Sequence, residues 1–338
     1  MNFYIRTLII SSFVLILPAL VMADTTDLLP PGPPGDPASR MKTLNQIEPR
    51  IFISSLPYTI SEPGAYYLTG NLTGVAGNNG ITIASDHVQL DLNGFALIGV
   101  SNSLHGIYFS GDKRHNAVIR NGIVRQWHLD GIHAAGAYDS VIEDVYVYKN
   151  GHSITNTGMW LQENWQVLRC GAVENEGTGI RAAFSLIRDC STRWNRGNGY
   201  DIVWGSKLQN SSAYYNTSNG VYSIGAAVIQ DNMIIGNYKN GIVTGDNSRV
   251  ERNYANQNWL AGILVGSGCR IEDNHAVNNS VNGIKTEENA TGSLVIRNSA
   301  RGNTWGNYNL NETTHYGTII NNAGPGFYES NPWANFEM

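Results

Sequence analysis

Charged residues are scarce in this 338-residue sequence. Only 14% of its residues are Asp, Glu, Lys or Arg, and the formal net charge is −5. Asn, Gly, Ser and Thr occupy the positions that charged residues fill in most chains. A nucleic-acid-binding protein needs a basic patch that faces the phosphates. The low charge and its negative sign therefore argue against a nucleic-acid partner.

Long apolar runs are also rare. The run Leu8–Leu20 lies close to the N-terminus, and Val21 and Ala23 follow it at the positions that a signal peptidase recognises. We predict a signal peptide at residues 1–23 and a Pro/Gly-rich linker at residues 24–37. No later segment is apolar enough to cross a bilayer, so we expect no membrane span in the mature chain. The expected location is secreted or periplasmic, with the cell surface as a further option.

Glycine and asparagine, by contrast, recur in register. The spacing of the opening glycines is 20 residues and then four times 21, and an apolar or aromatic residue follows each. They are Gly179, Gly199, Gly220, Gly241, Gly262 and Gly283. Four positions before each glycine stands an asparagine: Asn175, Asn195, Asn216, Asn237, Asn258 and Asn279. Nine positions before stand Cys170, Cys190, Ser211, Asn232, Asn253 and Asn274. A period of this kind fixes the architecture before any single motif is weighed.

A period of about 21 residues is too short for a two-helix repeat, and it lacks the leucine pattern of a horseshoe fold. It predicts an all-β, single-domain parallel β-helix, in which each repeat forms one coil. Equivalent residues then stack on neighbouring coils, about 4.8 Å apart. The asparagines have a structural interpretation, because each buried amide can bond its own turn and the amide one coil away. Each glycine provides either a positive φ or a close approach of two backbones.

The repeat also predicts the domain boundaries. Ten openings from Gly80 to Gly283 place the parallel β-helix at residues 80–305, with enlarged coils between Gly106 and Gly158. Solenoids need capped ends. We predict an N-terminal cap at residues 38–79 that begins with a short helix, and a C-terminal cap with an aromatic tail at residues 306–338.

The sequence contains three cysteines. Cys170 and Cys190 hold equivalent positions in consecutive repeats, so their predicted separation is short enough for a disulfide. A free, stacked pair of thiols is the alternative interpretation. Cys269 has no obvious mate.

The repeat has the form Ile-x-x-Asn-x-x-x-x-Asn-x-x-x-Gly-Ile at residues 229–242 and again at 271–284. This resembles the right-handed parallel β-helix repeat of the pectin-lyase-like superfamily. Residues 63–68, 80–83 and 90–94 are similar to secreted bacterial β-helix proteins whose activity is unsettled. The resemblance covers nearly all of the mature chain and implies the fold. That superfamily holds polysaccharide lyases, glycoside hydrolases, epimerases and non-catalytic binding proteins, so the fold alone does not imply one activity.

The better-known motifs of the superfamily are missing. A polygalacturonase-like member would show Asn-Thr-Asp, Asp-Asp, Gly-His-Gly and Arg-Ile-Lys, whereas this chain has Asn156-Thr157-Gly158 and Gly151-His152-Ser153. The sequence also lacks a carboxylate cluster like the calcium site of pectate lyases, and the glycine-rich nonapeptide of calcium-loaded rolls. No catalytic set is carried over from the resemblance, and we expect no metal or cofactor.

Candidate functional residues come instead from the side chains that point outward. Alternation along a strand places the second residue after each opening glycine on the solvent side. This exposed row comprises Thr82, Tyr108, His133, Trp160, Arg181, Asp201, Tyr222, Val243, Leu264 and Lys285. Aromatic faces flanked by charged groups are typical of sugar-binding surfaces. We predict that Tyr108, Trp160 and Tyr222 bind saccharide; the alternative is that these rings only pack on one another.

The same row suggests the chemistry of a polysaccharide lyase. Such an enzyme needs a group that neutralises the uronate carboxylate and a base that removes the adjacent proton. Arg181 is the candidate for the first role, and His133 or Tyr108 for the second. Asp201 is the carboxylate of the row and completes the candidate catalytic set.

A glycoside hydrolase would need two carboxyl groups, about 5 Å apart for retention or roughly 6.5–9.5 Å apart for inversion. Asp189, Asp231 and Asp273 recur on alternate coils, with Arg169, Asn210 and Arg252 at the equivalent positions between them. We interpret this column as a surface charge ladder. Glu251 and Glu272 are neighbours in another column, either as a repelling pair of functional interest or as two solvated carboxylates.

The favoured function is that of an exported, carbohydrate-active protein, a lyase or a hydrolase. Its substrate would be an extended polysaccharide bound across the coils from Tyr108 to Tyr222, with Arg181 available for the carboxylates of an acidic one. The alternative is a non-enzymatic secreted or cell-surface module that binds glycan or a protein partner.

Overall fold

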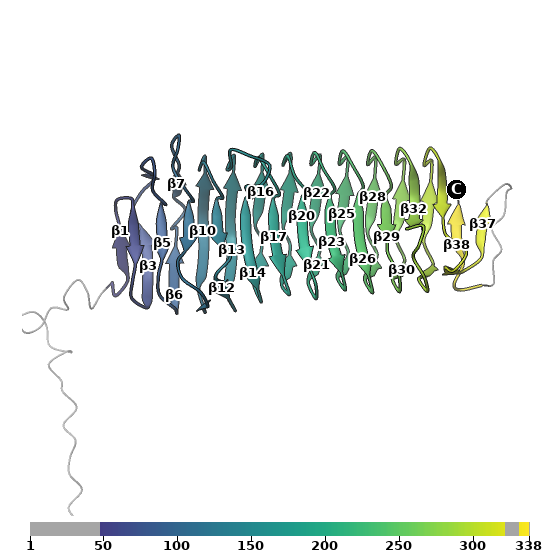
Figure 1. The fold of residues 1–338 in the computed structure, drawn as a ribbon, viewed down its shortest axis with the longest axis horizontal. Helices are drawn as coiled ribbons and strands as arrows, with labels where there is room; N and C mark the ends of the chain where they lie inside the picture. The colour runs from purple at the N-terminus through teal and green to yellow at the C-terminus, as the bar shows by residue number, and fades with distance from the viewer. Residues whose placement is uncertain (1–47, 322–330, 338) are drawn as a thin grey trace, which may run out of the picture. The chain divides into compact units, whose positions relative to one another are not determined.

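The structure is a computed structural model that describes residues 48–321 and 331–337. The predicted signal peptide, the linker and the capping helix before residue 48 lie outside the described residues. So do Phe327 and Tyr328 of the predicted aromatic tail. The unit that begins at Arg50 is a long stack of parallel coils (Figure 1).

Two large sheets and one small sheet make up the described coils. Sheet B has twelve strands: β2 (Tyr58–Ile60), β5 (Ile81–Ile83), β8 (Ile107–Phe109), β11 (Ile132–Ala134), β14 (Met159–Glu163), β17 (Ile180–Ala183), β20 (Tyr200–Val203), β23 (Val221–Gly225), β26 (Ile242–Asp246), β29 (Ile263–Val265), β32 (Asn282–Thr286) and β35 (Gly306–Asn309). The small sheet joins β9 (Arg114–His115) to β12 (Ala137–Tyr138).

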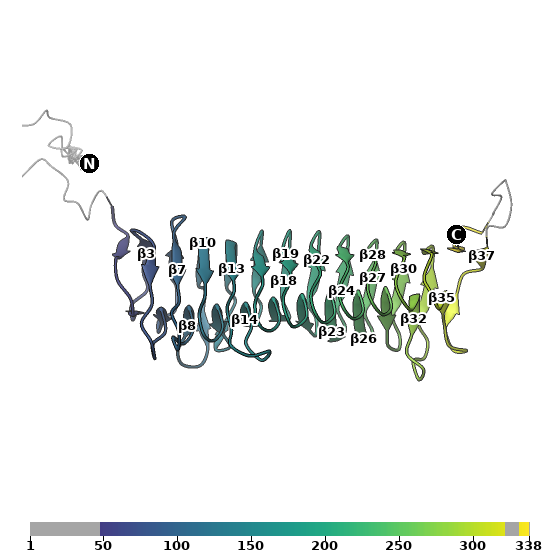
Figure 2. The ribbon, with the colours of Figure 1, turned by 90° about the horizontal axis from the view of Figure 1, so that it is seen from above.

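Sheet A has 24 strands, two in most coils. They are β1 (Ile51–Ile53), β3 (Gly64–Leu68), β4 (Leu72–Thr73), β6 (Val88–Asp91), β7 (Ala96–Ile98), β10 (Val118–Arg125), β13 (Val141–Tyr148), β15 (Gln166–Leu168), β16 (Gly171–Val173), β18 (Leu186–Arg188), β19 (Ser191–Arg193), β21 (Lys207–Gln209), β22 (Ser212–Tyr214), β24 (Val228–Gln230), β25 (Met233–Ile235), β27 (Arg249–Glu251), β28 (Tyr254–Asn256), β30 (Arg270–Glu272), β31 (His275–Val277), β33 (Leu294–Ile296), β34 (Ser299–Arg301), β36 (His315–Tyr316), β37 (Ile319–Asn321) and β38 (Asn335–Glu337). Figure 2 shows β7, β10 and β22 of sheet A along one side of the stack, and β8, β14 and β23 of sheet B along the other.

The ten predicted coils correspond to ten consecutive strands of sheet B, from β5 to β32. Strands β2 and β35 add one coil at each end, so sheet B has twelve rungs rather than ten. The residues assigned to the N-terminal cap already contain β1 to β4. Strand β1 pairs in parallel with β3, and β2, β3 and β4 pair in parallel with β5, β6 and β7 of the coil that follows. Parallel pairing therefore extends beyond the predicted limits of 80–305.

Inward-facing side chains of successive coils form the core. Ile119, Ile142 and Val167 are paired in register on β10, β13 and β15, and each is fully buried. Full burial of one such side chain contributes roughly 1.5–3 kcal/mol. Because each apolar column continues through the next coil, the core grows with the number of coils, as expected for a solenoid.

The asparagine column lies inside the stack, as the repeat predicted. The Asn195 side chain donates to Asn216 Oδ1 at 2.9 Å, and Asn216 donates to Asn237 Oδ1 at 3.0 Å. The same oxygens accept the backbone N–H groups of Asn195 and Asn216. All three residues are fully buried. These amides satisfy one another along the axis, which confirms their structural role.

Gly220 shows why glycine opens each coil. A Cβ at this position would lie 2.7 Å from the carbonyl oxygen of Gly241 and 2.8 Å from Asn237 Nδ2. The requirement is close approach between coils, because Gly220 is not among the positive-φ glycines of the described chain.

The three cysteines are buried and free. The Cys170 backbone N–H donates to Cys190 Sγ at 3.4 Å, so these two residues do lie in one column. Of the two interpretations left open by the sequence, the structure shows the stacked pair of free thiols. The Cys269 thiol donates to the Gly245 carbonyl.

No helix is present in the described residues, and hence none that is long and apolar enough to span a membrane. At the far end, Asn335 of β38 accepts the backbone N–H of Asn298 at 3.0 Å. The returning tail thus adds a last rung to the column that begins with Cys170.

Candidate functional site

The predicted exposed row exists on sheet B. The strand register pairs Tyr108 with His133, His133 with Trp160, and Trp160 with Arg181. It continues through Asp201 to Tyr222. Each of these side chains stands between two buried neighbours on its strand; Ile107 and Phe109, for example, flank Tyr108. The alternation that the sequence predicted is therefore present in all of these coils.

The rings at the N-terminal end of the row pack in series. Tyr108 and His133 are stacked with centroids 5.6 Å apart, and His133 meets Trp160 edge-on at 4.8 Å. His105, from the turn before β8, stacks on Tyr108 at 5.5 Å and lies 4.4 Å from His133. The predicted alternative, rings that pack on one another, is thus realised here. The sugar-binding role of these residues stays a prediction.

Asp130 fixes the orientation of His133. This carboxylate is 2% exposed and lies in the turn before β11. Its Oδ2 is 2.6 Å from His133 Nδ1, while its Oδ1 accepts the backbone N–H of Thr157 and, at 3.2 Å, the Thr157 hydroxyl. A carboxylate only accepts hydrogen bonds, so the proton of a neutral His133 ring is on Nδ1 and the lone pair is on Nε2.

His105 completes the cluster. Its Nδ1 accepts the backbone N–H of Asp130 at 3.2 Å and lies 3.4 Å from Asp130 Oδ2. Burial lowers the pKa of His105 to about 4; the Asp130 carboxylate opposes this shift, and His133 adds to it. His105 is therefore neutral near pH 7, as its role of acceptor requires.

Neither His105 nor Asp130 was predicted as a site residue from the sequence. They stand one position before the opening glycines Gly106 and Gly131, where later coils have Asn198, Asn219 and Asn240. The signal that would have found them is the replacement of an amide by ionisable groups within one column.

Arg181 is held between two other members of the row. Its guanidinium carbon lies 5.2 Å from the centre of the Trp160 ring, and its Nε is 3.8 Å from Asp201 Oδ2. The Arg181 side chain is 42% exposed, whereas that of Asp201 is 19% exposed. Burial raises the pKa of Asp201, and Arg181 opposes that shift. The outer part of the guanidinium remains accessible to an anion.

Tyr222 lies apart from this chain of contacts. It pairs in register with Asp201, and its side chain is exposed, but within the described residues no ring or ion-pair contact joins it to the other predicted site residues. The structure thus brings five of the six predicted residues together and leaves Tyr222 at the edge.

His105, Asp130 and His133 offer one ligand atom each within 4.8 Å of one another, which is the donor set of a divalent metal site. However, the 2.6 Å separation of His133 and Asp130 is that of a hydrogen bond. Two ligands on one zinc ion, at about 2.1 Å each, would stand about 3 Å or more apart. The geometry therefore fits a hydrogen-bonded acid–base group better than a metal centre.

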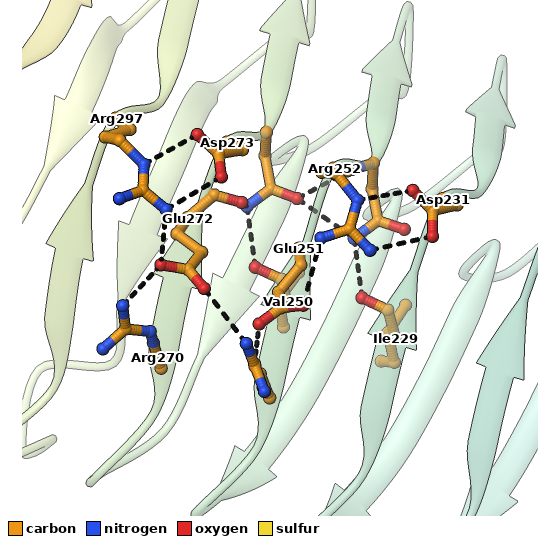
Figure 3. A network of polar contacts seen from close by, with 12 residues as sticks. Ile229, Asp231, Val250, Glu251, Arg252, Arg270, Glu272, Asp273 and Arg297 are labelled. Atoms are coloured by element: carbon orange, nitrogen blue, oxygen red, sulfur yellow. Dashed lines mark hydrogen bonds and ion pairs between the residues drawn. The ribbon is translucent and has the colours of Figure 1, made fainter.

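The carboxylates of the predicted charge ladder are engaged by arginines. Asp231 accepts two hydrogen bonds from Arg252, and Asp273 accepts two from Arg297 (Figure 3). Asp189 Oδ2 lies 3.3 Å from Arg188 Nε. These contacts confirm the interpretation of this column as a structural ladder, and they leave no free carboxylate pair in it for hydrolysis.

Glu251 and Glu272 differ from their prediction. They are neighbours in register on β27 and β30, as expected. Neither is solvated, because only 2% of Glu251 and 4% of Glu272 is exposed. Four arginines contact them and compensate their mutual repulsion: Arg249, together with Arg252, Arg270 and Arg297, which are labelled in Figure 3. A buried carboxylate pair held in this way is a structural cluster.

Comparison with known structures now identifies the fold. The A-module of the mannuronan C-5 epimerase AlgE4 from Azotobacter vinelandii matches with a TM-score of 0.61 at 14% identity, covering 84% of this chain and 88% of that one. The chain is a right-handed parallel β-helix. This confirms the fold implied by the pectin-lyase-like resemblance.

Two further solved structures agree. The periplasmic alginate epimerase AlgG matches with a TM-score of 0.51 at 13% identity, over 82% of this chain and 75% of that one. The catalytic domain of a GH87 α-1,3-glucanase, in complex with tetrasaccharides, matches with a TM-score of 0.56 at 13% identity, over 85% and 70%. No family model and no curated protein sequence matches the chain. At these identities the likenesses show the fold alone.

Proposed function

We propose that this protein binds an extended polysaccharide across sheet B and acts on an acidic one by proton transfer at His133. The observation that carries the proposal is the pairing of His133 with the buried Asp130, which leaves Nε2 of His133 as the lone-pair side of the ring. An imidazole held in one tautomer by a carboxylate is a common arrangement for a general base.

The neighbouring residues have the chemistry that such a reaction needs. Arg181 lies over the Trp160 ring, two strands from His133, and is placed for the carboxylate of a uronic acid unit. Neutralising that carboxylate makes the proton on the adjacent carbon easier to remove. The Tyr108 ring, stacked on His133, has a phenol that can supply a proton to a leaving oxygen.

The proposed step is an elimination. His133 Nε2 removes the proton on the carbon next to the carboxylate, and the electron pair of that C–H bond forms a carbon–carbon double bond. The glycosidic C–O bond at the next carbon breaks, and its oxygen leaves with a proton from Tyr108. Return of a proton to the opposite face instead of C–O cleavage would give epimerisation.

The names of the structural neighbours support the ligand class. Two are named for mannuronan and alginate and the third for an α-1,3-glucan. The signal peptide predicted at residues 1–23 fits a protein that meets polysaccharide outside the cytoplasm, and one neighbour is named as periplasmic.

The test incubates the protein, from residue 24 onward, with polymannuronate, alginate, polygalacturonate and an α-1,3-glucan. Ultraviolet absorbance detects an unsaturated product, and NMR in D2O detects proton exchange without cleavage. We expect His133→Ala and Asp130→Asn to lower turnover by roughly 10²- to 10⁴-fold. Binding should be retained.

His128→Ala is the matched control, because His128 stacks on His152 instead of joining the His133 cluster. Turnover that is unchanged in His133→Ala would contradict the mechanism. Binding without any turnover would favour the non-enzymatic glycan-binding module.

A further inference from the structure

The turns that enter the last strands of sheet B carry a strip of apolar side chains. We define the aromatic strip as Tyr238, Trp259, Leu260, Val281 and Trp305. Backbone hydrogen bonds from Leu260 to Lys239, from Val281 to Leu260, and from Trp305 to Val281 place its members on four consecutive coils. These turns lead into β26, β29, β32 and β35.

The strip is open to solvent. Tyr238 is 45% exposed, Trp259 57%, Leu260 40% and Trp305 76%. The rings of Tyr238 and Trp259 lie 4.5 Å apart at an angle of 33°, so they extend one another along the solenoid axis. Exposed apolar groups that form a continuous patch mark interaction sites more often than scattered ones do.

The fold itself does not require apolar residues at these positions. In earlier coils the column of Tyr238 and Trp259 holds Arg196 and Thr217, which make the equivalent backbone bond to the asparagine of the preceding coil. The column of Leu260 and Trp305 holds Gly197 and Ser218. Polar or small residues are accepted there, so packing alone does not account for the strip.

The dimensions of the strip favour a linear ligand. It is at most two side chains wide and spans three strand spacings, about 14 Å. A stable protein interface takes roughly 20–30 residues and about 800 Å² from each partner, far more than these five side chains provide. A hydrogen-bonding group is available in the same turn, because the exposed Lys239 directly follows Tyr238. Flat apolar faces next to polar groups match the faces and hydroxyls of sugar rings.

We propose that the aromatic strip is a second polysaccharide-binding surface, which holds a long chain on the C-terminal coils at a distance from His133. The ligand class rests on the proposed function. The strip lies along the same sheet as His133, with five strand spacings, about 24 Å, between β11 and β26. Only a long chain can occupy both places, so the strip acts on affinity for polymer and not on the chemical step.

Variants for the test come from the chain itself. Trp259→Thr introduces the residue found at Thr217, and Trp305→Ser introduces the one found at Ser218, so both substitutions suit their columns. Trp194→Gln is the control: Trp194 is 48% exposed on another turn, and Gln257 has a similar backbone conformation in a later coil. Polymannuronate and polygalacturonate serve as probes, each as polymer and as tetrasaccharide.

We expect the double variant to weaken polymer binding tenfold or more in affinity electrophoresis, while tetrasaccharide binding and turnover change less than twofold. Trp194→Gln should behave as wild type. The same comparison in the His133→Ala background needs no catalysis, so it separates failure of the strip from failure of the proposed function. Undiminished polymer affinity in the double variant would overturn the proposal. So would a change of sedimentation coefficient in that variant, because it would assign the strip to self-association.

Discussion

The column of residues that stand one position before the opening glycines differs between two regions of the solenoid. In the C-terminal half, the position before the opening glycine is an amide at Asn219 and Asn240, whose backbone N–H groups each donate to the amide oxygen one coil earlier, at 3.1 Å. In the N-terminal half, the Asp130 backbone N–H donates in the same way to His105 Nδ1, and that of Thr157 donates to Asp130 Oδ1. The same backbone hydrogen bond is present in both regions, but the side chain that accepts it is an amide in one and an imidazole or a carboxylate in the other.

The difference lies in where the remaining hydrogen-bonding capacity goes. The NH2 group of Asn219 donates to the amide oxygen of Asn198, so the amides of this column satisfy one another along the axis. The Asp130 carboxylate has no hydrogen-bond donor. Its second oxygen, Oδ2, instead pairs with Nδ1 of His133 on the outer face of sheet B. Identical side chains on successive coils thus indicate structure, whereas a change to ionisable groups within a column indicates a candidate site.

The largest effect should come from breaking a self-satisfied column. Asn237→Ala removes the oxygen that accepts both the backbone N–H and the side-chain amide of Asn216, in a region that excludes water. Two buried donors left unpaired cost about 1–3 kcal/mol each, so we expect a loss of about 4 kcal/mol in the free energy of unfolding. Urea titration measures it.

Asn309→Ala, an exposed asparagine on β35, is the control and should change stability by less than about 0.5 kcal/mol. Equal losses in the two variants would show that the column contributes no more than a surface amide does.

The mixed column should respond to pH, unlike the amide column. The pKa of His105 is about 4 in the folded state against an ordinary value of 6.5, so the unfolded chain binds the proton more readily between these values. The stability contribution is therefore present above pH 6.5 and is lost as the pH falls toward 4. The loss is at most about 3 kcal/mol at 1.36 kcal/mol per pKa unit.

His105→Asn is the matched control, because asparagine already occupies this column at Asn198 and still accepts a backbone N–H. We expect the urea midpoint of the wild type to fall relative to that of the variant between pH 6.5 and pH 4. Parallel profiles would mean that His105 titrates in the folded protein as it does in the unfolded chain.

Much of the fold was predictable from the sequence because its contacts repeat. Six asparagines and six glycines in register specify which residues touch, and the paired amides of Asn195, Asn216 and Asn237 confirm it. The coils at the two ends were harder to predict, because Pro57 and Asn307 stand before β2 and in β35 where the ten predicted coils have their opening glycine. The predicted helix before residue 48 lies outside the described residues.

The candidate site was predictable only in part. Strand alternation places His133, Trp160 and Arg181 on one face, which needs no knowledge of side-chain conformation. The contact between His133 and Asp130 is different, because it joins a strand to a turn in an enlarged coil where the period of 21 residues fails. Nothing in the repeat specifies how far such a turn folds back.

The smallest effect should come from Cys190→Ser. Cys190 Sγ accepts the Cys170 backbone N–H at 3.4 Å, and one coil later Ser211 Oγ accepts the Cys190 backbone N–H at 3.1 Å. Serine thus already fills this role in the same column, and we expect a change within about 1 kcal/mol under reducing conditions. Cys190→Val keeps the apolar bulk but removes the acceptor, so a buried N–H group is left unpaired at a cost of about 2 kcal/mol. Urea titration of both variants decides between two explanations of the column. If serine costs as much as valine, the thiol stabilises by its packing and not by accepting the backbone N–H.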